Sequence, residues 1–144
     1  MPHPSVLESP AEKPPAPFQF HHGYYDDLHP DPGVNFQMNR WINYLGGEAL
    51  EELRAIAPRL TDYPAYIREF IALGDRALSE GRKLPAAYYY RSAEFFLYAE
   101  DPRKKPLRRK FLELALEAWG IREGDRHAIP YQEGSREVSL PAYR

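Results

Sequence analysis

The sequence predicts a mainly α-helical fold: an antiparallel bundle of about five helices followed by a C-terminal β-hairpin. Three observations lead to this prediction. Apolar residues recur at intervals of three and four through most of residues 34–120. Gly and Pro divide this region into segments with short joins, which favours antiparallel packing of successive helices. After Gly120, apolar residues instead alternate with polar ones or form short runs, which is typical of strands.

Residues 1–33 are expected to form a Pro-rich arm and an irregular aromatic segment. Proline fixes φ and has no N–H group, so a stretch dense in proline favours an extended chain. The aromatic stretch that follows it, FQFHHGYYDDLHPDPG, is interrupted by Gly and Pro. The prolines of the arm are Pro2, Pro4, Pro10, Pro14, Pro15 and Pro17.

Residues 34–120 are expected to form one helical domain. Most of its segments have a single apolar face, whereas the fourth is apolar nearly all round. We therefore expect the fourth helix to be buried on more than one side. The helical segments are residues 35–47, 47–60, 61–81, 84–101 and 101–120.

Capping residues predict where two of these helices begin and end. Thr61 or Asp62 is a suitable N-cap for the third helix, and Gly81 is suitable just beyond its last turn. Asp101 is expected to cap the fifth helix, with Pro102 at its first position, where a missing N–H costs nothing.

Residues 127–144 are expected to form a β-hairpin. The stretches HAIPYQ and EVSLPAY have strand patterns, and the residues between them include Gly134 and Ser135, which favour a turn. Pro130 and Pro141 cannot donate to a ladder, so they suit strands at a sheet edge. Because a lone hairpin is marginal in water, this pair should lean on a sheet or a helix face.

Composition excludes several classes of protein. The formal net charge is −2, so no global field attracts nucleic acid or an anionic membrane. The absence of Cys excludes disulfides, zinc–thiolate sites and a cysteine nucleophile. The N-terminus lacks the pattern of a secretory signal, and no apolar run is long enough to span a bilayer. We expect a soluble cytoplasmic protein that binds neither nucleic acid nor membrane.

A group of His and Asp residues near the N-terminus raises the possibility of a metal site. Zinc needs ligands that converge at short fixed distances, typically from an i, i+4 pair on a helix. The segment has no such pair and is broken by Gly and Pro, so we expect neither a metal nor a cofactor. The residues are His21, His22, Asp26, Asp27, His29 and Asp31.

The stretch DPRKKPLRRK, residues 101–110, contains six basic residues, a local composition also found in phosphate-binding patches. Helical spacing spreads these charges over the side opposite Leu and Phe. Over the whole chain, acidic residues outnumber basic ones by 21 to 19. We therefore favour a solvated helix face, with a nucleic-acid adaptor as a distant alternative.

The sequence does not predict a catalytic centre. No serine lies in a G-x-S-x-G elbow, and no glycine-rich phosphate loop is present. His127 is the only histidine after the N-terminal segment, so a complete Ser–His–Asp triad is not expected.

A helical interaction module is the main alternative. The stretch ALSEGRKLPAAYYYRSAEFFLYAE has the small residues, large aromatics and short loop of a tetratricopeptide-like pair. Stable solenoids usually need three or more repeats, and no 34-residue self-similarity is found. A module of this kind also gives no account of the hairpin.

Three stretches resemble the N-terminal part of one group of α/β-hydrolases. They are NFQMNRWINYLG at 35–46, AAYYYRSAEFFLYAEDPRKKPLRRKFLELALEAW at 86–119 and IPYQEGSREVSLPAYR at 129–144. The group contains the fermentation–respiration switch protein, the pseudooxynicotine hydrolases and the fungal polyketide-shortening hydrolases. In these enzymes a helical segment precedes the core, and a hairpin of this kind opens the core sheet. The resemblance covers roughly residues 20–144.

The resemblance implies a serine hydrolase that acts on an ester, amide or C–C bond, with its catalytic residues in a core that is missing from this chain. Residues 34–120 would then be a cap that covers the pocket and helps to pair subunits, and residues 127–144 would begin the core. The implied partners are that core, a small-molecule substrate at the cap–core interface and a second copy of the chain. The chain alone would not be catalytic.

Aromatic residues at helical spacing are more often core, but some are expected to contact the substrate of such an enzyme. The first helix supplies the leading candidates and the fourth helix the second choices. In order, the candidates are Phe36, Arg40, Trp41, Tyr44, Tyr89, Tyr90 and Phe96.

Overall fold

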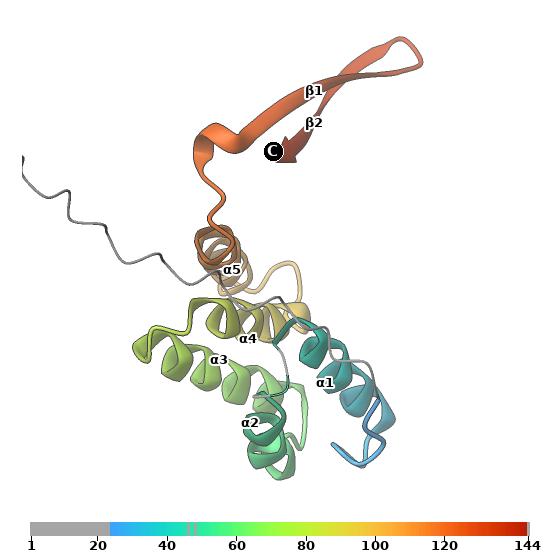
Figure 1. Cartoon of the computed structure of the whole chain (residues 1–144). Coiled ribbons are helices and arrows are strands. Elements are labelled where there is room, and N and C mark those ends of the chain that lie inside the picture. Colours follow the sequence, from blue (N-terminus) through green and yellow to red (C-terminus); the bar gives the residue numbers. More distant parts are fainter. Residues whose placement is uncertain (1–23, 46, 48, 144) are drawn as a thin grey trace, which may run out of the picture.

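The computed structural model describes residues 24–45, 47 and 49–143, and this part of the chain forms a helical bundle followed by a hairpin (Figure 1). The predicted mainly α fold is therefore confirmed. The elements are α1 (Pro32–Leu45), α2 (Ala49–Ile56), η1 (Ala57–Arg59), α3 (Tyr63–Ser79), α4 (Lys83–Phe95), α5 (Lys104–Ala118), η2 (Glu123–Asp125), β1 (Arg126–Glu133) and β2 (Arg136–Tyr143).

Aspartates cap the N-termini of α1 and α3. Asp31 Oδ1 accepts a hydrogen bond from the Val34 N–H at 2.9 Å, and Asp62 Oδ1 accepts one from the Ala65 N–H at 2.7 Å. Each bond satisfies an N–H group that has no partner inside its helix. Asp62 is thus the N-cap of the third helix, as the sequence predicts.

A glycine with positive φ follows each of α3 and α5. Gly81 has φ of 75° and Gly120 has φ of 69°, a conformation that costs little only for glycine. After α3, the Arg82 N–H donates to the Ala77 carbonyl at 2.8 Å and the Gly81 N–H to the Leu78 carbonyl at 3.0 Å. This pair of bonds is a Schellman motif, and the equivalent pair closes α5.

The start of α5 differs from the prediction. The helix begins at Lys104, and both Asp101 and Pro102 lie in the turn before it. Asp101 Oδ1 accepts a hydrogen bond from the Arg103 N–H at 2.8 Å, and the Asp101 carboxylate also holds the Arg103 guanidinium. A bond to the N–H two residues on forms an Asx-turn, which here replaces the expected first turn of helix.

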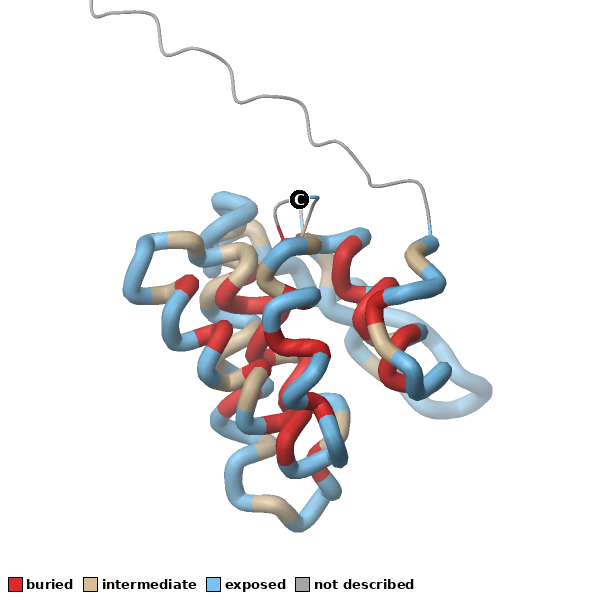
Figure 2. Tube along the Cα trace, turned by 90° about the horizontal axis from the view of Figure 1, so that it is seen from below, coloured by how far each residue is buried: buried red, intermediate tan, exposed pale blue. Residues whose placement is uncertain are grey.

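The central helix of the bundle is α4, which packs against α3, α5 and α1 (Figure 1). Eight of its 13 residues are buried, which confirms the expected burial on more than one side. Figure 2 shows the buried residues along the inner faces of the helices. The bulkiest fully buried side chains are those of Tyr66, Tyr89, Tyr90, Phe70, Met38, Ile42 and Leu53.

The hairpin is well paired but exposed. Gly134 and Ser135 join the antiparallel strands. Gly134 has φ of 61°, and Ser135 does not have positive φ, since no described residue other than glycine does. This combination is that of a type II′ turn. All of β1 is exposed, and in β2 only Val138 and Ala142 are partly covered. In Figure 1 the hairpin projects beyond the end of α5, away from the other helices.

Candidate functional site

Two of the predicted contact residues, Tyr89 and Tyr90, are fully buried. The Tyr89 hydroxyl donates to Glu52, and the Tyr90 hydroxyl donates to Asp75 at 2.6 Å and accepts from Lys110 Nζ at 2.7 Å. Burial raises the pKa of both tyrosines, and the neighbouring carboxylates raise it further. These two side chains link α4 to α2, α3 and α5, and their rings are closed to solvent.

Glu52 is the centre of an ion-pair network that the sequence does not predict. Its carboxylate accepts hydrogen bonds from Arg76 at 2.9 Å, from Arg82 at 2.8 Å and from Tyr89. Burial alone raises the pKa of Glu52, but hydrogen bonds from Arg82, Tyr89 and Arg76 outweigh it and lower the pKa to about 2. The network ties α2 to α3 and α4 and is structural.

Trp41 and Tyr44, two predicted residues of α1, belong with aromatic side chains of α4 and α5 and with Trp119 to a set that we call the aromatic face. Rings from different helices contact one another across this face. Three of its residues are exposed to solvent: Tyr44 by 44%, Phe95 by 37% and Trp119 by 53%. Its members are Trp41, Tyr44, Tyr88, Phe95, Phe111 and Trp119.

Stacking fixes the orientation of the exposed rings of the aromatic face. Tyr44 stacks on Tyr88 with centroids 4.8 Å apart and planes 11° from parallel. Phe95 meets Trp41 edge to face, at 6.3 Å and 75°. Trp41 and Tyr88 are buried beneath these rings, so the surface presents aromatic groups on a rigid support.

The other two predicted residues, Phe36 and Phe96, are not members of this face. Phe36, on α1, is 56% exposed. Phe96 is half-buried and packs against Tyr63, at 4.7 Å, and against Tyr66, at 4.6 Å. The structure therefore brings together Arg40, Trp41 and Tyr44 but neither Tyr89 nor Tyr90 with them. Whether any of these residues contacts a substrate stays a prediction.

Arginines accompany the aromatic face. The Arg40 guanidinium lies 5.2 Å from the centroid of the Trp41 ring and 5.3 Å from that of Phe95, and Arg91 lies 5.9 Å from the same Phe95 ring. Arg108 lies 5.9 Å from the Phe111 ring. These distances are within the range of cation–π attraction.

One buried carboxylate, Glu94, is shared by several of these cations. Its side chain is only 5% exposed; it pairs with Arg91 and lies 3.2 Å from Lys104 and 3.7 Å from Arg108. Lys104 also donates to the Glu94 and Leu97 carbonyls at the end of α4. The site therefore has more positive than negative charge, although the chain as a whole has a net charge of −2.

The sequence contains signals for the α4 part of the aromatic face and for its charged neighbours, although these residues were not predicted as contact residues. Tyr88, Arg91 and Phe95 stand at i, i+3 and i+7, and therefore share one face of α4. Arg91 and Glu94 are also polar residues within an aromatic run. Trp119 has no comparable signal, because it follows the last turn of α5.

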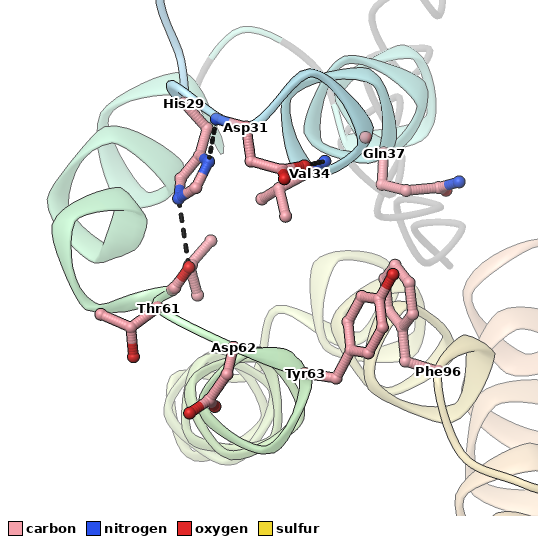
Figure 3. Close-up of a pocket in the computed structure, with 10 residues that line it drawn as sticks. His29, Asp31, Val34, Gln37, Thr61, Asp62, Tyr63 and Phe96 are labelled. Atoms are coloured by element: carbon pink, nitrogen blue, oxygen red, sulfur yellow. Dashed lines mark hydrogen bonds between the residues drawn. The ribbon is translucent and has the colours of Figure 1, made fainter.

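A pocket of about 460 Å³ lies between the N-termini of α1 and α3 (Figure 3). Tyr63 and Phe96 stack to form one wall. His29 Nδ1 accepts from the Asp31 N–H at 3.0 Å, and its Nε2 lies 3.1 Å from the Leu60 carbonyl, to which it donates. Both ring nitrogens are thus occupied by backbone groups, so His29 is not placed to act as a general base.

A second polar feature lies beneath the aromatic face. Trp41 Nε1, the Tyr66 hydroxyl and Ser92 Oγ are buried and have no hydrogen-bond partner among the described residues. Burial raises the pKa of Tyr66, while Trp41 and Ser92 are close enough to its hydroxyl to oppose that rise. Unpaired buried polar groups are uncommon, and here Trp41 and Ser92 both lie beside the Tyr66 hydroxyl.

The described residues contain no group of three or more His, Cys, Asp or Glu side chains that could hold a metal ion. His21 and His22 lie outside these residues, and Asp27 lies 3.5 Å from Arg54. No helix in this part of the chain has the length and apolarity that a membrane crossing requires.

Comparison with known proteins does not place the chain in a family. Family models, curated proteins and solved structures were each searched, and none matches it. The function must therefore be argued from the geometry of this molecule.

Proposed function

We propose that the helices form the cap of an α/β serine hydrolase and that the hairpin supplies the first two strands of its core sheet. Such an enzyme hydrolyses an ester, an amide or a C–C bond with catalytic groups of the core, so the chain by itself is not catalytic. The observation that carries the proposal is the apolar face that the hairpin leaves uncovered.

The pairing register defines that face. Ile129 pairs with Leu140, and Tyr131 pairs with Val138, so these four side chains lie on one side of the ladder. Ile129, Tyr131 and Leu140 are 50%, 52% and 49% exposed. A two-stranded sheet with an open apolar face gains stability by packing against further structure, which a core sheet and its covering helices provide.

The aromatic face of the helices supports the cap role. A lid over a hydrolase pocket supplies apolar walls and excludes water from the reaction. Tyr44, Phe95 and Trp119 offer such a wall on a rigid support. The same exposed rings are suited to pairing with a second subunit, as the resemblance to hydrolase caps implies.

The sequence encoded after Arg144 tests the proposal directly. A strand followed by a G-x-S-x-G elbow, in frame, is the expected result. A stop codon with no adjacent hydrolase gene, or an unrelated domain, would overturn it. The matching activity test uses p-nitrophenyl esters, on which the 144-residue chain should show no serine-dependent turnover.

Limited proteolysis tests the role of the hairpin. Without a sheet to join, residues 127–144 should be cut well before the helices, because exposed strands open more easily than buried helices. Resistance equal to that of the helices would mean that the hairpin is already covered, by the bundle or by another copy.

A tetratricopeptide-like interaction module is the second candidate, and one contact favours it. A Cβ added at Gly74 of α3 would lie 2.6 Å from the ring of Tyr90 in α4, so a small residue faces a large aromatic across an antiparallel helix pair. This is the type of packing expected in helical repeats. The hairpin has no role in such a module, which is why the hydrolase cap is preferred.

A further inference from the structure

We propose that Arg40, Arg91 and Arg108, here called the arginine cluster, bind the carboxylate of a small aromatic acid whose ring lies against the aromatic face. The proposal deepens the proposed function, on which it rests for the idea that this face lines a substrate pocket, and it names the substrate class.

Two of the arginines share one exposed ring. The guanidinium groups of Arg40, from α1, and Arg91, from α4, lie 5.3 Å and 5.9 Å from the centroid of Phe95. A guanidinium that contacts a ring in this way keeps N–H donors free, and its planar fork matches the two oxygens of a carboxylate.

The charges around the cluster are not balanced within the described residues. Glu94 is the only carboxylate paired there, and it already pairs with Arg91 and Lys104. Arg108 is 3.7 Å from Glu94, beyond hydrogen-bond distance, and Arg40 has no ion pair with any described residue. Donors of two arginines thus remain available for an anion.

The arginines are also close enough to repel one another. Burial lowers the pKa of Arg91, Glu94 opposes this, and the charges of Arg108 and Arg40 lower it further. An anion placed among the three groups relieves that repulsion. Arg40 and Arg108 are exposed, but the Arg91 side chain is only 21% exposed. A monoanionic carboxylate that reaches Arg91 therefore takes less charge out of water than a phosphate dianion would.

The apolar part of the ligand has a defined place. Phe95 exposes the ring that Arg40 and Arg91 contact, and Tyr44 exposes a ring next to Trp41, while the rings below hold Tyr44 and Phe95 in fixed orientations. An aryl group gains both buried area and ring–ring contact against such a surface. An aromatic acid therefore satisfies the arginines and the rings at once.

Tryptophan fluorescence tests this site, because both tryptophans of the chain, Trp41 and Trp119, belong to the aromatic face. The probe is 3-phenylpropionate, titrated into the full chain and compared with its neutral amide, 3-phenylpropanamide. We expect a saturable change with a dissociation constant of about 1–5 mM for the acid, and binding about tenfold weaker for the amide. Equal binding of acid and amide, or no saturable change with the acid, would overturn the proposal.

Variants assign the effect to the cluster. Arg40→Gln should remove most of the preference for the acid, and Arg108→Gln should reduce it. The matched control is Arg68→Gln, which removes another exposed charge, on α3. Its partner, Glu69, keeps the bond to Arg59 at 2.9 Å. If Arg40→Gln and Arg68→Gln behave alike while both remain folded by circular dichroism, the arginine cluster is not the site.

Two further measurements distinguish a carboxylate ligand from other occupants of this site. Phenyl phosphate that binds more tightly than 3-phenylpropionate would overturn the choice of a carboxylate. A dimer in sedimentation that Trp119→Ala returns to a monomer, together with no response to the acid, would make the face an interface between copies instead. None of these outcomes depends on what is encoded after Arg144, so this inference and the proposed function fail separately.

Discussion

The helical bundle and the hairpin differ in what holds them together. Core side chains such as Met38, Leu53 and Phe70 are fully buried and are brought together from different helices. Burial of each contributes about 1.5–3 kcal/mol. The hairpin has its own ladder and a favourable turn, but Ile129 and Leu140 remain about half exposed. Regular secondary structure alone therefore does not indicate where the stability of a chain resides.

The largest expected effect separates these two regions. Phe70→Ala removes a fully buried ring that stacks on Tyr66 at 4.3 Å, and it should lower the free energy of unfolding by about 3–5 kcal/mol. Urea unfolding followed by far-UV circular dichroism measures the change. The matched control, Tyr131→Ala in the hairpin, should alter it by less than about 0.5 kcal/mol. Similar losses from both variants would show that the hairpin is part of the same cooperative unit.

The Glu52 network should make the bundle sensitive to acid. Because its pKa in the folded state is lowered to about 2, the stabilisation from Glu52 is complete above its unfolded pKa of 4.5 and is lost as the pH falls towards 2. Allowing for partial exposure, the effect is about 2 kcal/mol. Unfolding in urea at pH 7 and at pH 3 tests it. Glu52→Gln should have a lower free energy of unfolding than the unaltered chain at pH 7, and this free energy should fall less on acidification. The exposed control Glu113→Gln should show the same pH dependence of stability as the unaltered chain.

A smaller effect is expected at the contact between α3 and α4. In Gly74→Ala the new Cβ meets the fully buried Tyr90 ring, which has no space to withdraw. The strain, less the gain in helix propensity, should cost about 1–2 kcal/mol in thermal unfolding experiments. Gly124→Ala is the control, since a Cβ there meets nothing within 4 Å. An unchanged or more stable Gly74→Ala variant would mean that the helices can separate at little cost.

The last test changes no residue and measures amide hydrogen exchange in the unaltered chain. Amides of α4 should exchange only through global unfolding, because this helix is buried against three others. Amides of β1 and β2 should exchange faster, through local opening that leaves the bundle folded. Equal protection in the two regions would show that the hairpin and the bundle open together.

Local signals in the sequence were sufficient where local chemistry decides the structure. Asp62 and Gly81 were predicted because a cap and a left-handed glycine act within one turn of chain. The same type of signal failed at Asp101, where the aspartate forms an Asx-turn with Arg103 instead of capping a helix. An aspartate favours both an N-cap and an Asx-turn, and residue type does not distinguish them.

The candidate site was predicted only in part, for a different reason. Arg40, Trp41 and Tyr44 were selected for their aromatic density, but their partners Tyr88 and Phe95 come from a more distant part of the chain. Periodicity shows which residues share a face of one helix, not which helices meet. Tyr89 lies next to Tyr88 in sequence, yet its ring enters the core.

The two prolines of the hairpin have a consequence for self-association. Pro130 pairs with Ser139 and Pro141 with Ala128, at positions whose backbone groups point outward, since Glu133 and Arg136 form the hydrogen-bonded pair beside the turn. Each outer edge therefore lacks one N–H donor near its middle. Another strand that approaches either edge loses one ladder hydrogen bond, a small cost for one added core strand but a repeated cost in the continuous stacking of strands found in amyloid. The prolines therefore make each edge of the hairpin a poorer template for fibrils than an uninterrupted strand.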